Sequence, residues 1–138
     1  MTFERVQSKL DLLRANLEQL DRIPQASLDE WRSDFRNVQA TLHLLQTSIQ
    51  ALLDVGAYLV AQRALPTPST SLAVLEALEA AGSLPAGTGA KYAPVIGFRN
   101  RVVHLYERID ERRVYEVLTQ HRQDLAALLD LLLAAGGA

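Results

Sequence analysis

The chain has 138 residues, a formal net charge of −2, and a composition that is 49% hydrophobic and 22% charged, which is typical of one globular domain spanning residues 1–138. The absence of cysteine excludes disulfides, thiolate catalysis and zinc–thiolate sites, and the small net charge provides no global attraction for nucleic acid. No signal-peptide pattern follows Met1, and no uninterrupted apolar run approaches the ~18–20 residues of a membrane span, so we expect a soluble cytoplasmic protein.

The first predicted helix covers residues 2–22. Apolar side chains recur there every three or four positions, which places them on one face of a helix. These residues are Phe3, Val6, Leu10, Leu13, Leu17 and Leu20. Pro24 follows and ends the helix.

A second, much longer helix is predicted over residues 28–63. Ser27, followed three residues later by Glu30, is typical of a capping box and begins it. The apolar seven-residue repeat then continues without a break, so we expect this helix to form the centre of a bundle. Trp31 and Phe35 are one turn apart, and we expect both to pack on the first helix.

Two residues inside the second helix have open interpretations. Gly56 costs roughly 1 kcal/mol relative to alanine in a helix, and close packing of a neighbouring helix is its expected purpose. Asp54 lies near the apolar face. We expect an ordinary exposed aspartate there, and the alternative is a carboxylate that orients a histidine or an arginine.

The remaining chain predicts three more helices, over residues 72–81, 93–108 and 111–135, with a loop over residues 83–90. The second of these predicted helices is introduced by Tyr92 and Pro94. Helix caps and breakers mark the other boundaries: Thr70 or Ser71, Gly82, Pro85, Gly87, Gly89 and Asp110.

These elements predict an all-α fold. Four long amphipathic helices with short connections form an antiparallel up-and-down bundle, and the short helix over 72–81 lies at its side. The apolar faces are wider than one small bundle needs, so we expect a homodimer.

The segment from Phe98 to Tyr106 concentrates the polar residues that could carry chemistry. At about 100° per residue, Phe98 belongs to an apolar stripe with Val102, Leu105 and Ile109. Asn100 and His104 lie one turn apart and nearly opposite that stripe, whereas Arg99 and Tyr106 share one flank and Arg101 and Arg108 the other. Between positions 99 and 113 there are five arginines and three acidic residues, which suits phosphate binding without requiring it.

This segment resembles the signature of a known family. The pattern Arg-X4-His-X-Tyr, formed by Arg99, His104 and Tyr106 with Asn100 directly after the arginine, is similar to that of HepT proteins. These are small all-helical HEPN-domain ribonuclease toxins paired with an MNT-type minimal nucleotidyltransferase antitoxin. The chain length, the helix order and the Leu53-Asp54-X-Gly56 segment agree with the resemblance.

The resemblance implies a metal-independent endoribonuclease with its site at a homodimer interface. In that family Arg99 and His104 correspond to the catalytic pair, and Tyr106 to the residue that accepts AMP from the antitoxin. Added nucleotide would place bulk and negative charge beside the arginines and block RNA. The plainer interpretation of Tyr106 is packing beside the apolar stripe.

The residues themselves suit phosphodiester cleavage. Histidine titrates near neutrality, so His104 is our candidate acid or base. Arg99 offers a planar charged fork for phosphate and transition-state charge, Asn100 is expected to position the substrate or His104, and Arg101 is auxiliary. Without the family pattern, an ordinary solvated helix face would be the expectation.

Other residues suggest no further chemistry. We expect His43 and His121 to be packing residues, and two scattered histidines make a poor metal site, so we expect no metal and no cofactor. Two alternatives remain to the ribonuclease. One is a non-catalytic helical adaptor or substrate-binding partner of a nucleotidyltransferase, modified at Tyr106, and the other is a helical scaffold without a nucleotide connection.

Overall fold

A computed structural model describes residues 2–104 and 110–136, with the backbone alone at residues 3 and 102–104. The predicted all-α fold is confirmed over these residues. Its elements are α1 (Phe3–Arg22), α2 (Leu28–Arg32), α3 (Phe35–Gln62), α4 (Ser71–Ala80), α5 (Thr88–His104), α6 (Glu111–Glu116), a π-helical turn (Val117–His121) and α7 (Arg122–Ala135).

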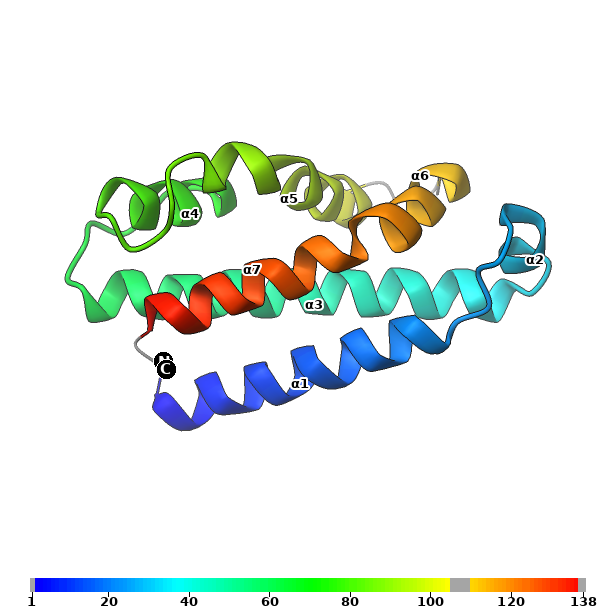
Figure 1. Cartoon of the computed structure of the whole chain (residues 1–138), viewed down its shortest axis with the longest axis horizontal. Helices are drawn as coiled ribbons and strands as arrows, with labels where there is room; N and C mark the ends of the chain where they lie inside the picture. Colours follow the sequence, from blue (N-terminus) through cyan, green and yellow to red (C-terminus); the bar gives the residue numbers. More distant parts are fainter. Residues whose placement is uncertain (1, 105–109, 137–138) are drawn as a thin grey trace.

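Helix α3 is the centre of an antiparallel bundle. It packs against α1, α4, α5 and α7. The chain runs along the bundle in α1, returns in α3, runs forward again in α5 and returns through α6 and α7, so α1 begins and α7 ends at the same end of the bundle (Figure 1). The predicted up-and-down order of four long helical segments with a short helix at the side is therefore confirmed.

The core that joins these helices is mainly aliphatic, and most of the predicted apolar faces contribute to it. Leu13, Leu45, Leu75 and Leu118 are fully buried in it. Helix α3 is also long and apolar enough to cross a membrane by composition alone, but 61% of that stretch is buried inside the protein, as expected for the central helix of a bundle.

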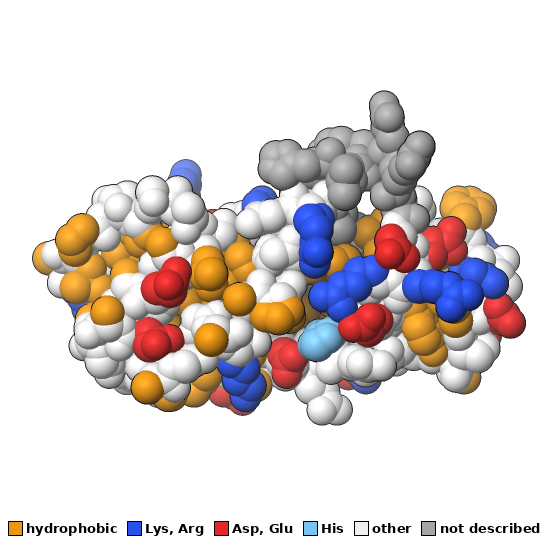
Figure 2. Space-filling view, turned by 90° about the horizontal axis from the view of Figure 1, so that it is seen from above, with side chains coloured by type: hydrophobic (Ala, Val, Ile, Leu, Met, Phe, Trp, Pro, Cys, Tyr) orange, Lys and Arg blue, Asp and Glu red, His pale blue; other side chains and the backbone are white. Residues whose placement is uncertain are grey.

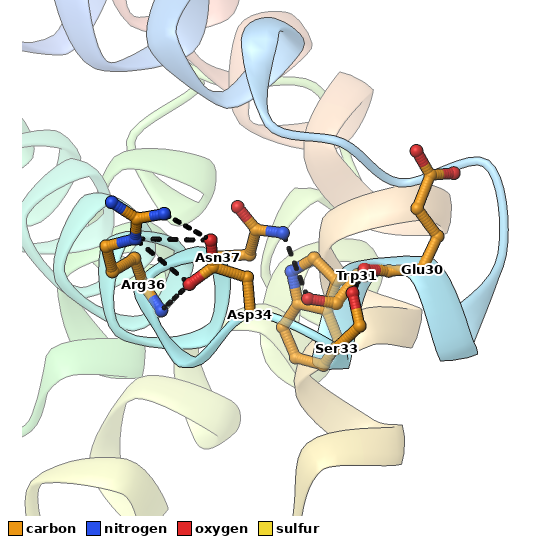
Figure 3. A network of polar contacts seen from close by, with 6 residues as sticks. All are labelled: Glu30, Trp31, Ser33, Asp34, Arg36 and Asn37. Carbon is orange, nitrogen blue, oxygen red and sulfur yellow. Dashed lines mark hydrogen bonds and ion pairs between the residues drawn. The ribbon is translucent and has the colours of Figure 1, made fainter.

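The unbroken helix predicted over residues 28–63 is wrong, because the chain turns between α2 and α3. Helix α2 ends at Ser33, whose hydroxyl donates a hydrogen bond to the Glu30 carbonyl oxygen at 2.6 Å. Asp34 is extended and caps α3 by accepting a hydrogen bond from the Arg36 backbone N–H at 2.9 Å. The Asn37 amide closes the turn by donating to the Trp31 carbonyl oxygen (Figure 3).

This turn separates the two aromatic residues that were expected to pack together on α1. Trp31 is fully buried, and its indole N–H donates to the Thr41 hydroxyl at 3.0 Å. Its ring centroid lies 5.5 Å from that of Tyr115 in α6. Phe35 is 74% exposed instead. A helix break of two residues rotates position 35 away from the face that carries Trp31.

The helix predicted over 111–135 begins as expected, because the Asp110 carboxylate accepts a hydrogen bond from the Arg113 backbone N–H. It is not one regular α-helix, since a π-turn separates α6 from α7. A π-turn adds one residue to the helical repeat and so shifts the apolar face. His121, predicted within that face, is half-buried and contacts carboxylates of Asp124 and Glu116.

Gly56 has the predicted role. A Cβ atom at this position would lie 2.8 Å from Cγ1 of Val74 in α4, so only glycine allows α4 to approach α3 this closely. The sequence predicts an exposed Asp54, and the structure differs. Asp54 is half-buried, forms an ion pair with Lys9 of α1 at 3.1 Å and accepts a hydrogen bond from Gln50.

Candidate active site

Helix α5 carries the candidate residues, and it begins five residues earlier than predicted. Its first turn is fastened to α4 by Glu79, whose carboxylate accepts a hydrogen bond from the Gly89 backbone N–H at 2.8 Å. The Thr88 hydroxyl also donates to the Pro85 carbonyl oxygen at 2.6 Å. These contacts provide a helix start ahead of Pro94, which therefore lies inside the helix.

The contacts with the start of α5 lower the pKa of the Glu79 carboxyl. Hydrogen bonds from backbone N–H groups, first that of Gly89 and then those of Gly87 and Thr88, lower its pKa below the usual 4.5. An anion here also complements the positive end of the α5 dipole. Glu79 is thus a positioning residue that fixes where the candidate helix starts.

The pKa of Glu79 predicts a pH dependence of stability. A depressed folded-state pKa contributes stability that is fully present above the unfolded value near 4.5 and is lost as the pH falls through the folded value. We expect Glu79→Gln to unfold at a lower temperature than wild type at neutral pH, with the gap closing as the solution is acidified. Thermal melts followed by circular dichroism from pH 7 downward measure this.

Glu76→Gln is the matched control, because Glu76 is exposed on the same helix one turn earlier. It should melt close to wild type at every pH. A Glu79→Gln gap that stayed constant with pH would show that the carboxylate charge does not contribute.

The second half of α5 presents the predicted faces wherever side chains are described. Phe98 is 3% exposed and lies in the core, as do Val95 and Ile96, which precede it by three and two residues. Asn100 and Arg101 are exposed, and Arg99 is half-buried between these two faces. The Arg99 guanidinium donates a long hydrogen bond, 3.4 Å, to the Asn100 side-chain oxygen. The candidate arginine and its asparagine neighbour are therefore in contact at the surface.

Position 104 is the last residue of α5. The backbone of α5 is helical through His104, so position 104 lies one turn beyond Asn100 on the same side of the helix. The His104 side chain and all of Tyr106 lie outside the described residues. Their predicted roles stay predictions.

Further charged groups lie on α6, the π-turn and α7. Arg113 forms an ion pair with Glu116 at 2.6 Å, and Nδ1 of His121 lies 3.0 Å from the Asp124 carboxylate. Figure 2 shows basic and acidic side chains beside one another on this face, with a histidine among them. Apolar spacing alone predicts His121 in the core, whereas Asp124, three residues later in the same helix, is the local signal for its carboxylate contact.

His43, predicted to pack, is exposed on α3, because it lies on the side of the helix away from the core. Among the side chains that the structure describes, which do not include that of His104, no three histidine or acidic residues are placed to hold a metal ion.

Comparison with known proteins identifies the family. The family described as ribonuclease HepT-like matches residues 13–132, most of the chain. The chain belongs to the HepT-like ribonuclease family. The resemblance drawn from Arg99, His104 and Tyr106 is thus confirmed at the level of the family.

Individual relatives of this HepT-like chain are distant. A protein named tRNA nuclease HepT from Aphanizomenon flos-aquae (strain 2012/KM1/D3) is 27% identical over 114 residues, which cover 83% of this chain and 78% of the relative. A tri-AMPylated Shewanella oneidensis HEPN toxin, solved in complex with MNT antitoxin, superposes with a TM-score of 0.83 at 19% identity, covering 97% of this chain and 99% of that one. A toxin–antitoxin crystal structure with AMP-PNP gives 0.81 at 17% identity, covering 96% and 99%. These structures share the HEPN fold of the chain.

Proposed function

We propose that this HepT-like chain is a metal-independent endoribonuclease, the toxin of a HEPN/MNT toxin–antitoxin pair, and that AMP transfer to Tyr106 silences it. The observation that carries the proposal is the polar end of α5, where half-buried Arg99 contacts exposed Asn100 and is followed by exposed Arg101, one turn before His104, in a chain of this family. Because the proposed substrate is RNA and the proposed partner is a nucleotidyltransferase, we propose that the protein acts in the cytoplasm.

The proposed chemistry uses groups whose properties suit phosphodiester cleavage. His104 exchanges a proton with the attacking 2′-hydroxyl or the leaving 5′-oxygen, a task matched to imidazole near neutral pH. Arg99 holds the phosphate through paired N–H donors and stabilises the charge that grows on its oxygens in the transition state. Asn100, in contact with Arg99, positions the substrate or His104, and Arg101 adds positive charge.

A second copy of the chain completes the proposed site. Arg99 and His104 are five positions apart in one helix, so they project roughly 140° from each other at ~100° per residue. The exposed face of α5 that carries Asn100 and Arg101 is therefore our proposed homodimer interface. There, Arg99 of one protomer and His104 of its partner act on the same phosphate.

Silencing follows from the position of Tyr106, two residues after His104. The tyrosine oxygen attacks the α-phosphorus of ATP in the partner's active site, pyrophosphate leaves, and an AMP group remains on the ring oxygen. The added phosphate is negatively charged and bulky, so it competes with RNA for the arginines. The relatives solved with MNT antitoxin or with AMP-PNP support this pairing.

The test compares protein expressed alone with protein co-expressed with a neighbouring nucleotidyltransferase gene. We expect the co-expressed protein to gain mass in units of an AMP group and to stop cleaving RNA, while Tyr106→Phe gains no mass and continues to cleave. Intact-mass spectrometry and cleavage of a labelled RNA measure the two effects.

The outcomes separate the proposal from its alternative. Mass gain at Tyr106 in a protein that never cleaves RNA would favour the non-catalytic adaptor of a nucleotidyltransferase. If the co-expressed protein gained no mass and formed no complex with the nucleotidyltransferase, the toxin–antitoxin assignment would be removed.

A further inference from the structure

The corner between α2 and α3 presents an exposed aromatic residue on a firmly held backbone. Phe35 is 74% exposed, the most exposed large hydrophobic side chain in the described part of the chain. The residues on either side of it are fixed to each other, because the Arg36 guanidinium binds both carboxylate oxygens of Asp34 at 2.8 to 3.1 Å (Figure 3). A backbone held in this way has less conformational entropy to lose when a partner covers the aromatic ring.

Charge around Phe35 is slightly negative. The corner carries three carboxylates, of Asp29, Glu30 and Asp34, and two guanidiniums, of Arg32 and Arg36. Arg32 pairs with Asp29 at 3.1 Å and Arg36 with Asp34, which leaves one carboxylate in excess. A partner surface that suits this corner is therefore an apolar hollow with a positive rim.

The chain has such a hollow at its other end. A partly open hollow of about 340 Å³ lies between α1, α3 and α7, at the end of the bundle where α1 begins and α7 ends (Figure 1). Arg14 and Arg63 stand among its lining residues, and within the described chain none of those residues is acidic. Arg14 forms an ion pair with exposed Asp11 at 3.9 Å, whereas Arg63 binds the uncharged Ala135 carbonyl oxygen, so these two arginines and Asp11 together leave one positive charge in excess at the rim. Its apolar walls come from Val6, Leu10, Val55, Leu59, Leu132 and Leu133.

Phe35 cannot reach the hollow of its own molecule. It is the first residue of α3, which has 28 residues and spans about 40 Å at ~1.5 Å per residue, and the hollow adjoins the last two turns of that helix. We propose that Phe35 of one copy inserts into the hollow of a second copy and joins the two molecules end to end.

Size and charge agree with this contact. A cavity of about 150 Å³ suffices for a benzene ring, so the hollow has room for the phenyl group. The excess carboxylate of the corner then faces the rim arginines, which favours this orientation. The two surfaces differ, so the contact is heterologous and extends to further copies unless a ring closes.

The contact is independent of the proposed RNA chemistry. Neither Arg99 nor Asn100 takes part in it, and it uses the ends of the bundle instead of the exposed face of α5. Failure of the ribonuclease proposal would leave this contact standing, and the reverse also holds.

Sedimentation velocity over a range of protein concentrations tests the proposal. We expect wild type to form species larger than a dimer as the concentration rises. Phe35→Ala should weaken this association by roughly 10-fold or more, as expected for an interface anchor. Leu12→Ala is the control, because Leu12 on α1 is also an exposed large hydrophobic residue, at 42%, and lies outside both surfaces.

Variants of the hollow must have the same effect. Arg14→Glu reverses a rim charge and Gln62→Trp fills the space, and each should weaken association as Phe35→Ala does while circular dichroism stays that of wild type. Mixing Phe35→Ala with Gln62→Trp should restore one junction, since each variant keeps one intact end. Wild type that never exceeds a dimer, or a Phe35→Ala effect that the hollow variants do not share, would overturn the proposal.

Discussion

His104→Ala should lose RNA cleavage by about 100- to 10,000-fold, the range that a positioned acid or base contributes. The fold should survive, because position 104 lies one turn beyond the exposed Asn100 at the end of α5. Single-turnover cleavage of a labelled RNA by protein purified without its partner measures the loss. His43→Ala is the matched control, since His43 is an exposed histidine of α3 and should leave the rate unchanged.

Arg99 provides a second test of the same site. Arg99→Ala should cost about 100- to 1,000-fold, as removal of one transition-state donor does. Arg99→Lys should recover only part of this, because an ammonium keeps the charge and loses the planar fork.

Two results would contradict the role of His104. Cleavage by His104→Ala at the wild-type rate would remove the proton-transfer role, and a His104→Ala protein that unfolds would show that the residue belongs to the core.

Much of the bundle could be predicted because its determinants are local. Ser27 and Asp110 are predicted caps, and Thr70 is one of two candidates with Ser71; each of the three accepts a hydrogen bond from a backbone N–H three residues later. The three- and four-residue spacing of apolar side chains placed Phe98 in the core and Asn100 at the surface by the same reasoning.

The errors arise where tertiary contacts or small backbone changes decide the structure. The apolar repeat continues past Ser33 and Asp34, so periodicity alone does not reveal the break that lets Trp31 reach α6. The π-turn at Val117–His121 changes the helical register by one residue without any glycine or proline to mark it. Glu79 reaches the start of α5 only because α4 packs beside it, and one sequence does not indicate that proximity.

The same distinction applies to the candidate site. Residue types and spacing within one helix indicated which side chains share a face, and the described part of α5 agrees. Assembly of Arg99 with His104 depends on a second helix, which no spacing within the chain can specify. The charged contacts of His121 were missed for a related reason, since the π-turn rotates this histidine out of the predicted apolar face.

Trp31→Ala should destabilise the protein by about 3–5 kcal/mol, the cost of removing a fully buried tryptophan side chain. Trp31 is 0% exposed and connects three elements through its contacts with Thr41 of α3 and Tyr115 of α6. Helix α2 has only five residues, too few to be stable without such packing. Urea unfolding followed by circular dichroism measures the change in the free energy of unfolding.

Two aromatic controls separate packing from hydrogen bonding at this corner. Trp31→Phe keeps most of the ring volume and loses the hydrogen bond to Thr41, so it should cost less than Trp31→Ala. The Thr41 hydroxyl still donates to the Asn37 carbonyl oxygen at 2.7 Å, so it is not left without a partner. Phe35→Ala, four residues away and exposed, should change stability by less than about 0.5 kcal/mol. If Phe35→Ala cost as much as Trp31→Ala, the two rings would share one buried face, and the break between α2 and α3 that separates them would be wrong.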